Sequence, residues 1–163
     1  MPRRNPPWMI RGAEIGPVYH GGKSKITLLD ESRLQARDYG FYGEGFYVTT
    51  SKSYAKTYGP RVTEFEVWPD AKILVSALKP QDAPRGLAEE VLNYIYKEGI
   101  EKARARGKEK AFVEHVRSIP ENILEWKNAV DRFAVGQDFD AVIHSLGEIV
   151  VKHPDILAVV TRR

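Results

Sequence analysis

Three short segments, far apart in the sequence, carry the residue types that could together build a binding site. They are Val18-Tyr19-His20-Gly21-Gly22, then Gly43-Glu44-Gly45-Phe46-Tyr47 with Tyr58 behind it, and Gly147-Glu148-Ile149-Val150-Val151. Each places a polar side chain at the edge of a strand-like run, and each has glycines nearby. These side chains converge only if their strands pack side by side, which is how a fold builds one site from distant residues.

The carboxylate and the two phenols each allow two interpretations. Glu148 could face water, or it could lie in a cleft of low dielectric, where a carboxylate stabilises a developing cation or orients a sugar hydroxyl. Tyr47 and Tyr58 are expected on a strand and on the short helix that follows it. Two phenol rings brought together could hold a planar ring between them, although ordinary core packing explains either tyrosine alone.

The glycines and the first histidine suggest contacts to a ligand. His20 could donate a hydrogen bond to a ribose hydroxyl, and Gly21 leaves its backbone N–H and C=O open to a ligand amide. Gly43 and Gly45 bracket the turn before Tyr47, where glycine allows positive φ and close approach of a ligand. The other histidines show no spacing typical of a metal site, so no metal is expected.

Short strands on either side of a helical middle must position these residues. Alternation and β-branched content predict strands at 17–20, 46–50, 62–67 and 71–76, and again at 141–143, 148–152 and 156–161. The last strands are expected to pair as hairpins, with 153–155 as a tight connection. Ser51 is expected to cap a short helix that Gly59 and Pro60 end.

The middle of the chain shows helical periodicity. Leu87, Val91 and Ile95 recur at a spacing of four, and Gly99 and Gly107 are expected to weaken or break this helix. Residues 118–121 resemble a capping box for a further helix, with Ile123, Trp126, Val130 and Phe133 along one side and Gly136 at its end. Strands, helices and strands in this order predict an α+β fold with mainly antiparallel sheets.

Length and composition set the frame for these elements. The 163 residues fit a single domain spanning 1–163, with residues 1–12 expected to be a flexible basic leader. The absence of cysteine excludes disulfides and thiol catalysis. No apolar run approaches the roughly 20 residues of a bilayer span and no signal peptide is expected, so a cytoplasmic protein without membrane contact is predicted. The net charge of +3 is small, and the basic stretch 102–110 is interpreted as solvated surface.

Taken together, the segments resemble the signature regions of ADP-ribosyltransferases of the His-Tyr-Glu branch. That branch includes diphtheria toxin and the poly(ADP-ribose) polymerases, and the likeness is greatest to small bacterial and phage toxin-like members. It rests on Tyr19-His20-Gly21, Gly43-x-Gly45-Phe46-Tyr47, Ala55-x-x-Tyr58 and Gly147-Glu148-Ile149-Val150-Val151, with support from Ala71-Lys72-Ile73-Leu74 and Asp138-Phe139-Asp140-Ala141-Val142-Ile143. The matching segments span most of the chain in order.

The resemblance implies a split pair of antiparallel sheets and a role in NAD chemistry for each matched residue. His20 would bind the adenosine ribose, and the backbone of Gly21 would hold the nicotinamide carboxamide. Tyr47 and Tyr58 would stack on the nicotinamide ring. Glu148 would bind the nicotinamide ribose and support the oxocarbenium-like state as nicotinamide leaves. The catalytic residues would therefore be His20, Tyr47 and Glu148.

Three positions depart from the family pattern. Gly22 stands where many members have Ser or Thr, and Ala55 stands where the polymerases place a serine that helps to hold the carboxamide. Leu146 lies two residues before Glu148, where arginine-modifying relatives carry a second acidic residue. The last departure argues against arginine as the acceptor and leaves no obvious side chain there to activate an acceptor.

The function that the resemblance implies is mono-ADP-ribosyl transfer from NAD to a macromolecular acceptor, protein or nucleic acid, by a toxin- or phage-effector-like enzyme. An antitoxin or immunity protein would be a further partner. Two alternatives stay open at this point: an NAD glycohydrolase that uses the same site, and a non-catalytic module that binds nucleic acid or a nucleotide. RNA 2′-phosphotransferases share the fold but rely on arginines, and none stands beside the three segments.

Overall fold

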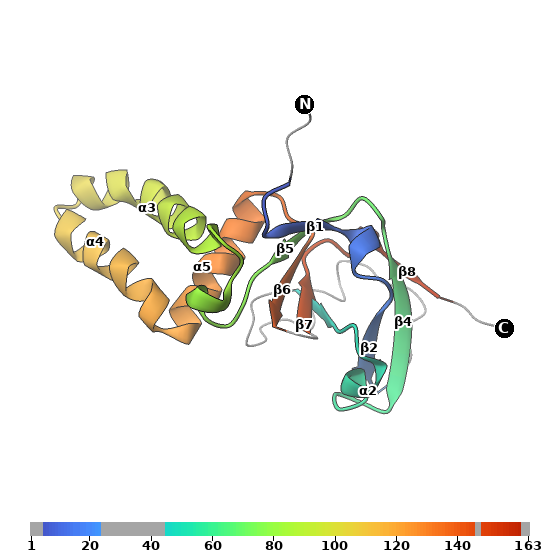
Figure 1. Ribbon diagram of the computed structural model, residues 1–163. Helices are drawn as coiled ribbons and strands as arrows, with labels where there is room; N and C mark the ends of the chain where they lie inside the picture. The colour runs from blue at the N-terminus through green and yellow to red at the C-terminus, as the bar shows by residue number, and fades with distance from the viewer. Residues whose placement is uncertain (1–4, 24–44, 146–147, 161–163) are drawn as a thin grey trace.

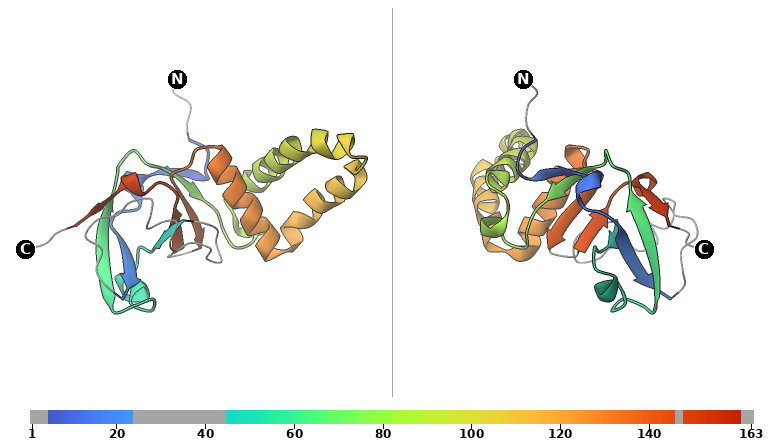
Figure 2. Two further views of the ribbon diagram at one scale, coloured as in Figure 1. Left: turned by 180° about the vertical axis from the view of Figure 1, so that it is seen from behind. Right: turned by 45° about the vertical axis from the view of Figure 1, so that its right-hand side comes forward.

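The computed structural model describes residues 5–23, 45–145 and 148–160, which form two β-sheets and a group of helices (Figure 1). Both sheets are mainly antiparallel, and the three longer helices lie together to one side of them, as two further views show (Figure 2). The predicted α+β class and the helical middle are thus confirmed. Within the described residues, no helix has the length and apolar character needed to span a bilayer.

The larger sheet has five strands and brings distant parts of the chain together. In spatial order these are β1 (Met9–Arg11), β5 (Lys72–Val75), β6 (Ala141–Ser145), β7 (Glu148–Val151) and β3 (Phe46–Val48). Only β5 and β6 run parallel among these neighbours, and the long connection that a parallel pair needs contains the helices.

The prediction that residues 1–12 form a flexible leader is wrong for residues 9–12, which have regular structure. Met9–Arg11 is β1, and its Met9 and Ile10 pair with Leu74 and Ile73 of β5. Both side chains are partly buried, because each packs against a different core cluster. Residues 12–14 continue as the 3-10 helix η1 (Gly12–Glu14), and residues 1–4 lie outside the described residues.

The smaller sheet has three strands, β2 (Val18–Gly22), β4 (Arg61–Val67) and β8 (Leu157–Val159), with β4 in the centre. The hairpin predicted for β6 and β7 is confirmed, with Val142 opposite Val150. The hairpin predicted for β7 and β8 is wrong, because β8 pairs with β4 in the other sheet. The 3-10 helix η4 (Pro154–Ile156) redirects the chain there, and Trp68 N–H donates to the Ile156 carbonyl at 2.7 Å.

The helices are α2 (Lys52–Ala55), α3 (Leu87–Ala105), α4 (Glu109–Ser118) and α5 (Ile123–Gly136), with 3-10 helices η2 (Pro80–Asp82) and η3 (Ile119–Glu121). Ser51 caps α2 as predicted, because its hydroxyl accepts the Tyr54 N–H. Gly107, at φ 69°, follows the end of α3, but Gly99 does not break it. A β-carbon on Gly99 would lie 2.4 Å from Phe112, so the glycine lets α4 approach α3 closely.

The N-terminus of α5 differs from the prediction. Ser118 donates its hydroxyl to the His115 carbonyl and caps nothing, whereas the Asn122 side chain accepts the Glu125 N–H and caps α5. The proline at 120 lies in η3 instead of the first turn of α5. Because α5 therefore begins at Ile123, that side chain is 45% exposed and is not part of the predicted apolar stripe.

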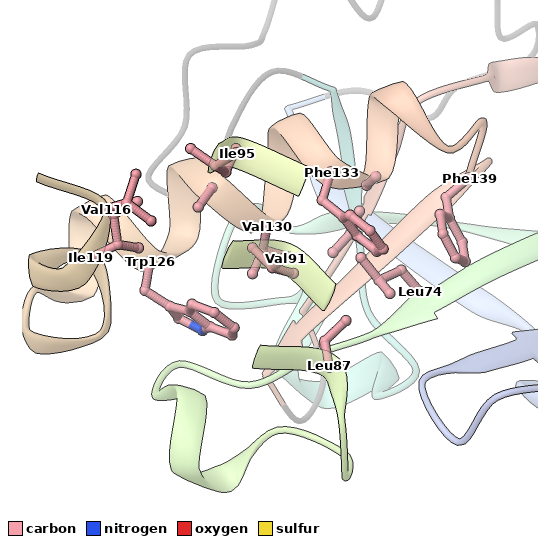
Figure 3. Close-up of a cluster of buried hydrophobic side chains, with 13 residues drawn as sticks. Leu74, Leu87, Val91, Ile95, Val116, Ile119, Trp126, Val130, Phe133 and Phe139 are labelled. Atoms are coloured by element: carbon pink, nitrogen blue, oxygen red, sulfur yellow. The ribbon is translucent and has the colours of Figure 1, made fainter. Parts of the chain in front are cut away.

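Two apolar cores lie on the two faces of the larger sheet, as the alternation of side chains along a strand requires. Leu74 and Val142 point toward the helices, where Trp126, Val130 and Phe133 of α5 are buried (Figure 3). The neighbouring residues Ile73 and Ala141 point the other way, into a core shared by the two sheets. That second core also contains Val18, Phe46, Phe65 and Ile149, so it sets the position of β2 against β3 and β7.

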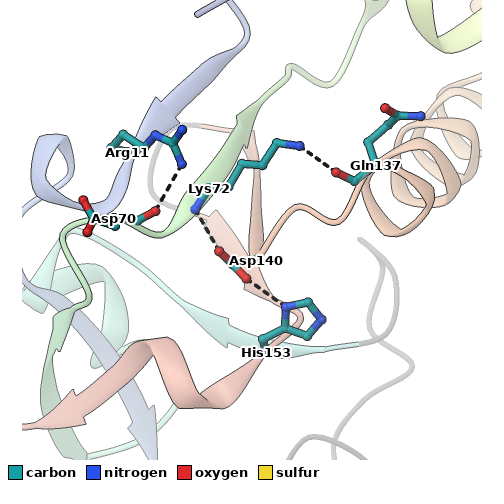
Figure 4. A network of polar contacts seen from close by, with 6 residues as sticks. All are labelled: Arg11, Asp70, Lys72, Gln137, Asp140 and His153. Atoms are coloured by element: carbon teal, nitrogen blue, oxygen red, sulfur yellow. Dashed lines mark hydrogen bonds and ion pairs between the residues drawn. The ribbon is translucent and has the colours of Figure 1, made fainter.

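A polar network ties the start of β5 to both ends of the β6–β7 hairpin. The Asp140 carboxylate accepts the Lys72 backbone N–H at 2.8 Å and lies 2.9 Å from His153 Nδ1 (Figure 4). The Lys72 ammonium donates to the Gln137 carbonyl at 2.7 Å. These bonds hold the chain where it leaves α5 and enters β6.

Candidate active site

The edges of the two sheets meet where β2 and β3 lie side by side. Tyr19 and Thr49 exchange backbone hydrogen bonds of 2.7 and 2.9 Å, which join the sheets at one point. Beyond this bridge lies a pocket of about 540 Å³, within the range of about 300–1,000 Å³ that is typical of small-molecule sites. Its described lining residues are Tyr19, His20, Gly21, Gly22, Lys23, Tyr47, Val48, Thr49, Ala55, Tyr58 and Glu148. The five residues that were expected from the sequence to contact a ligand thus all line this pocket: His20, Gly21, Tyr47, Tyr58 and Glu148.

Strand register explains why Tyr47 and Glu148 meet. Tyr47 is paired with Val150 across β3 and β7, and Glu148 lies two residues before Val150, so the three side chains share one face of the sheet. Phe46 and Ile149 point to the opposite face and enter the core between the sheets. The apolar face therefore fixes the register, and the register delivers a phenol and a carboxylate to the pocket.

His20 is held from two sides. Its side chain is 7% exposed, its ring stacks on Phe46 at 4.4 Å, and its Nδ1 lies 3.0 Å from the Tyr47 carbonyl oxygen. A carbonyl oxygen only accepts, so Nδ1 is the donor in this bond, and in the neutral tautomer that it favours Nε2 would be an acceptor. In that tautomer, a ribose hydroxyl would donate its hydrogen bond to Nε2, whereas His20 was expected from the sequence to be the donor.

The backbone of Gly21 points toward the pocket. Backbone groups alternate along a strand, and Tyr19 directs both its N–H and its C=O to Thr49 of the neighbouring sheet. Gly21, two residues later, directs its own N–H and C=O to the same edge. This edge borders the pocket, so both groups are oriented to meet a ligand amide.

Glycines also let α2 rest directly on the backbone of β2. A β-carbon on Gly21 would lie 1.8 Å from the Ala55 carbonyl oxygen, and one on Gly59 would lie 2.5 Å from the Gly22 carbonyl. Larger residues at either position would push α2 away. Close packing is thus a second reason for glycine here, and it sets the position of every side chain that α2 and its following turn present to the pocket.

Gly45 has a packing role, and it is not among the described residues that line the pocket. A β-carbon on Gly45 would lie 2.6 Å from the Val150 side chain and 2.8 Å from the Val151 carbonyl oxygen. The glycine therefore lets β3 begin directly against β7. Gly43 and Gly147 lie outside the described residues, as does Leu146.

One site residue, Tyr54, was missed in the sequence. Its hydroxyl donates to Glu148 Oε1 at 2.8 Å, and the Tyr58 hydroxyl donates to the same oxygen at 3.0 Å. The two phenol oxygens are 3.2 Å apart, and the rings meet edge to face at 5.6 Å. Spacing was the available signal, because residues four apart share one face of a helix, and a helix through Tyr58 was expected. The helix α2 in fact ends at Ala55, and Tyr58 lies in the turn that follows it.

Tyr58 makes a contact that the resemblance does not include. Its side chain is 61% exposed, and its hydroxyl is bound to the catalytic candidate Glu148. The hydrogen bond with Tyr54, then burial, and then the bond and the charge of Glu148 raise the pKa of Tyr58 above its usual 10.0. Tyr58 is therefore expected to keep its proton, and to remain a donor to the carboxylate, to a higher pH than an ordinary tyrosine.

The charges around the pocket are few. Among the described lining residues, Glu148 is the one carboxylate and Lys23 is the one Lys or Arg. Arg61 is the register partner of Gly22 on β4, yet it is not one of those lining residues. No group of three or more metal-ligating side chains occurs among the described residues.

Comparison of the chain with known protein families, with curated proteins and with solved structures gives no match. The resemblance to ADP-ribosyltransferases therefore rests on the residues of the three segments themselves.

Proposed function

We propose that this protein is an NAD-dependent mono-ADP-ribosyltransferase of the His-Tyr-Glu branch. The observation that carries the proposal is the convergence of His20, Gly21, Tyr47, Tyr58 and Glu148 on one pocket of about 540 Å³. These residues come from three distant segments, and a shared pocket is the arrangement that dinucleotide chemistry at these residues requires. Two mainly antiparallel sheets that meet at a pocket also suit the split fold of that family.

Each pocket residue has a role that its geometry allows. His20 would accept a hydrogen bond from a ribose hydroxyl at Nε2, because Nδ1 is bound to the Tyr47 carbonyl. The Gly21 backbone offers one donor and one acceptor to the nicotinamide carboxamide. Tyr47 presents a ring on the face shared with Glu148, and Tyr58 lines the same pocket while it donates to the carboxylate.

Glu148 would promote the bond cleavage electrostatically. Both phenol bonds use Oε1, so Oε2 is the oxygen that a nicotinamide-ribose hydroxyl would meet. As the glycosidic C–N bond breaks, its electron pair leaves with nicotinamide and positive charge develops on the ribose. The fixed carboxylate stabilises that charge, and such a group typically lowers the barrier by about 3 kcal/mol, or roughly a hundredfold in rate. The acceptor nucleophile then bonds to the ribose carbon and loses its proton.

The test is release of nicotinamide from NAD by the Glu148→Ala variant. We expect its rate to fall at least about a hundredfold. Glu66→Ala is the matched control, because Glu66 is exposed on β4 and pairs with Ala158 away from the pocket. Circular dichroism and thermal melting of both variants check the fold. Wild-type turnover in a folded Glu148→Ala protein would contradict the assignment.

A second candidate, NAD glycohydrolase, is favoured by one observation. Glu148 is the one carboxylate among the described lining residues, so these provide no second acidic group to activate a macromolecular acceptor. Water would then take the place of the acceptor in the same site. Incubation of adenine-labelled NAD with the protein plus RNA, DNA and a cell lysate separates the two activities. Label on a polymer supports transfer, whereas label only in free ADP-ribose supports hydrolysis. The acceptor, and with it any antitoxin or immunity partner, stays open in this proposal.

A further inference from the structure

A helical arm, formed by residues 96–117 of α3, α4 and the turn between them, extends away from both sheets (Figures 1 and 2). Its two helices pack through Tyr96 and Phe112, whose ring centroids are 6.3 Å apart, and through Gly99, against which Phe112 lies. The outer end of the arm, residues 102–110, is here called the tip. The arm stands apart from the pocket between the sheets, and the proposed NAD chemistry assigns it no role.

The tip carries a larger net positive charge than the whole chain. It contains five Lys or Arg residues and one Glu, which gives a formal charge of +4, compared with +3 for the entire chain. The rest of the chain therefore carries −1. The single tip carboxylate, Glu109, is already bound by Arg104 at 3.1 Å. Lys102, Arg106, Lys108 and Lys110 are exposed, and none of these four forms an ion pair with a described residue.

Internal contacts hold the tip in one shape. Arg104, in the last turn of α3, bonds to Glu101 on its own helix and to Glu109 at the start of α4, both at 3.1 Å. Gly107, at φ 69°, makes the tight turn between the helices, and Lys108 N–H donates to the Ala103 carbonyl at 2.8 Å. The four exposed cations are thus displayed on a braced turn. A surface hollow of about 580 Å³ lies beside Lys110, and its lining contains three basic residues (Arg104, Lys110 and Arg117) and two carboxylates (Glu109 and Glu114).

The chemistry of this surface favours a phosphodiester backbone over a protein partner. The large apolar side chains that are exposed among the described residues all lie outside the arm, so the arm lacks the aromatic and apolar anchors typical of protein interfaces. Nucleic acids instead present one phosphate charge after another, and exposed Lys and Arg side chains bind them with release of counterions. We propose that the tip of the α3–α4 arm is a docking surface for the backbone of a nucleic acid.

Binding of fluorescently labelled duplex DNA, single-stranded DNA and single-stranded RNA, followed by anisotropy without NAD, tests this inference. The test variant is Arg106→Glu/Lys108→Glu at the tip. The matched control, Lys79→Glu/Arg85→Glu, makes the same change of charge at two exposed residues near the base of α3. We expect the tip variant to bind at least about tenfold more weakly at moderate salt. For duplex DNA we expect the magnitude of the salt slope to fall by about 2, since each lost phosphate contact removes about 0.9.

Each outcome of this comparison is decisive. Loss confined to the tip variant, similar for different base sequences, supports backbone binding. Equal affinity of the tip variant and the wild type, or equal loss in both variants, overturns it. Stronger binding of poly-glutamate than of the nucleic acids would also overturn it, because the tip would then select an acidic protein. Nicotinamide release is measured separately, so the failure of either proposal leaves the other unaffected.

Discussion

The hydroxyl of Tyr54 donates a hydrogen bond of 2.8 Å to Oε1 of Glu148, a residue 94 positions later in the chain. This bond joins α2, which packs on β2 where Gly21 leaves room, to the first residue of β7. Tyr58 donates to the same oxygen at 3.0 Å. The carboxylate is thus oriented by two phenols that lie four residues apart, one on α2 and one in the turn that follows it.

Tyr54→Phe should slow nicotinamide release and leave the fold intact. The change removes one hydrogen bond to the Glu148 carboxylate but keeps the ring. Because the Tyr54 side chain is 39% exposed and water weakens the bond, we expect the transition state to lose about 1 kcal/mol of stabilisation. That corresponds to roughly a fivefold reduction in kcat with little change in KM. Tyr96→Phe, in the helical arm, is the control. Equal rates for the two variants would show that Tyr54 does not position Glu148.

Tyr58 should lose its proton at a higher pH than an ordinary tyrosine. Its neutral form is favoured in the folded state, so its contribution to stability is complete below the unfolded pKa of 10.0 and is lost as pH rises through the higher folded value. The ultraviolet absorbance difference between wild type and Tyr58→Phe reports this group alone. We expect its midpoint above 10.0, and a lower midpoint in a Tyr54→Phe background, because the Tyr54 bond is the largest cause. An ordinary midpoint in the wild type would contradict the hydrogen-bond geometry.

His20→Asn should separate the two nitrogens of the imidazole. The asparagine amide nitrogen can replace Nδ1 and keep the bond to the Tyr47 carbonyl, but no atom replaces Nε2. Calorimetric titration should therefore show NAD binding weakened by about tenfold, with little loss of thermal stability. His20→Ala removes both contacts and should also destabilise the fold by about 1–3 kcal/mol. Unchanged NAD affinity in His20→Asn would exclude a ligand contact at Nε2.

Gly21→Ala should disturb the pocket through α2. The added β-carbon would meet the Ala55 carbonyl oxygen at 1.8 Å, so α2 must shift, at a cost of about 1–3 kcal/mol. Gly107→Ala is the comparison, because its cost comes from a φ of 69° with nothing within 4 Å. Both variants should unfold at a lower temperature than the wild type, but only Gly21→Ala should weaken NAD binding. Normal binding by Gly21→Ala would mean that the α2 contact does not set the site.

The sequence predicted the strands near the site well, because alternation and β-branched residues depend on neighbours along the chain. The prediction that His20, Tyr47 and Glu148 share one site depended on a family resemblance. Pairing over long distances was harder to predict. The pairing of β8 with β4 depends on the redirection of the chain at η4, which no local pattern reveals.

The role of Tyr54 shows the same limit within the site itself. Its bond to Glu148 exists because Gly21 and Gly59 let α2 settle on β2, and that contact is visible only in three dimensions. Similarly, Met9–Arg11 became a strand because the edge of β5 offered backbone partners, a fact that the proline-rich, basic composition around it obscured.

The most direct measurement is a crystal structure of the protein with a non-hydrolysable NAD analogue. The account predicts the nicotinamide ring between Tyr47 and Tyr58, its carboxamide on the backbone of Gly21, and a ribose hydroxyl within hydrogen-bond distance of Glu148 Oε2. An analogue bound elsewhere, or a pocket that stays empty at saturating analogue, would contradict it.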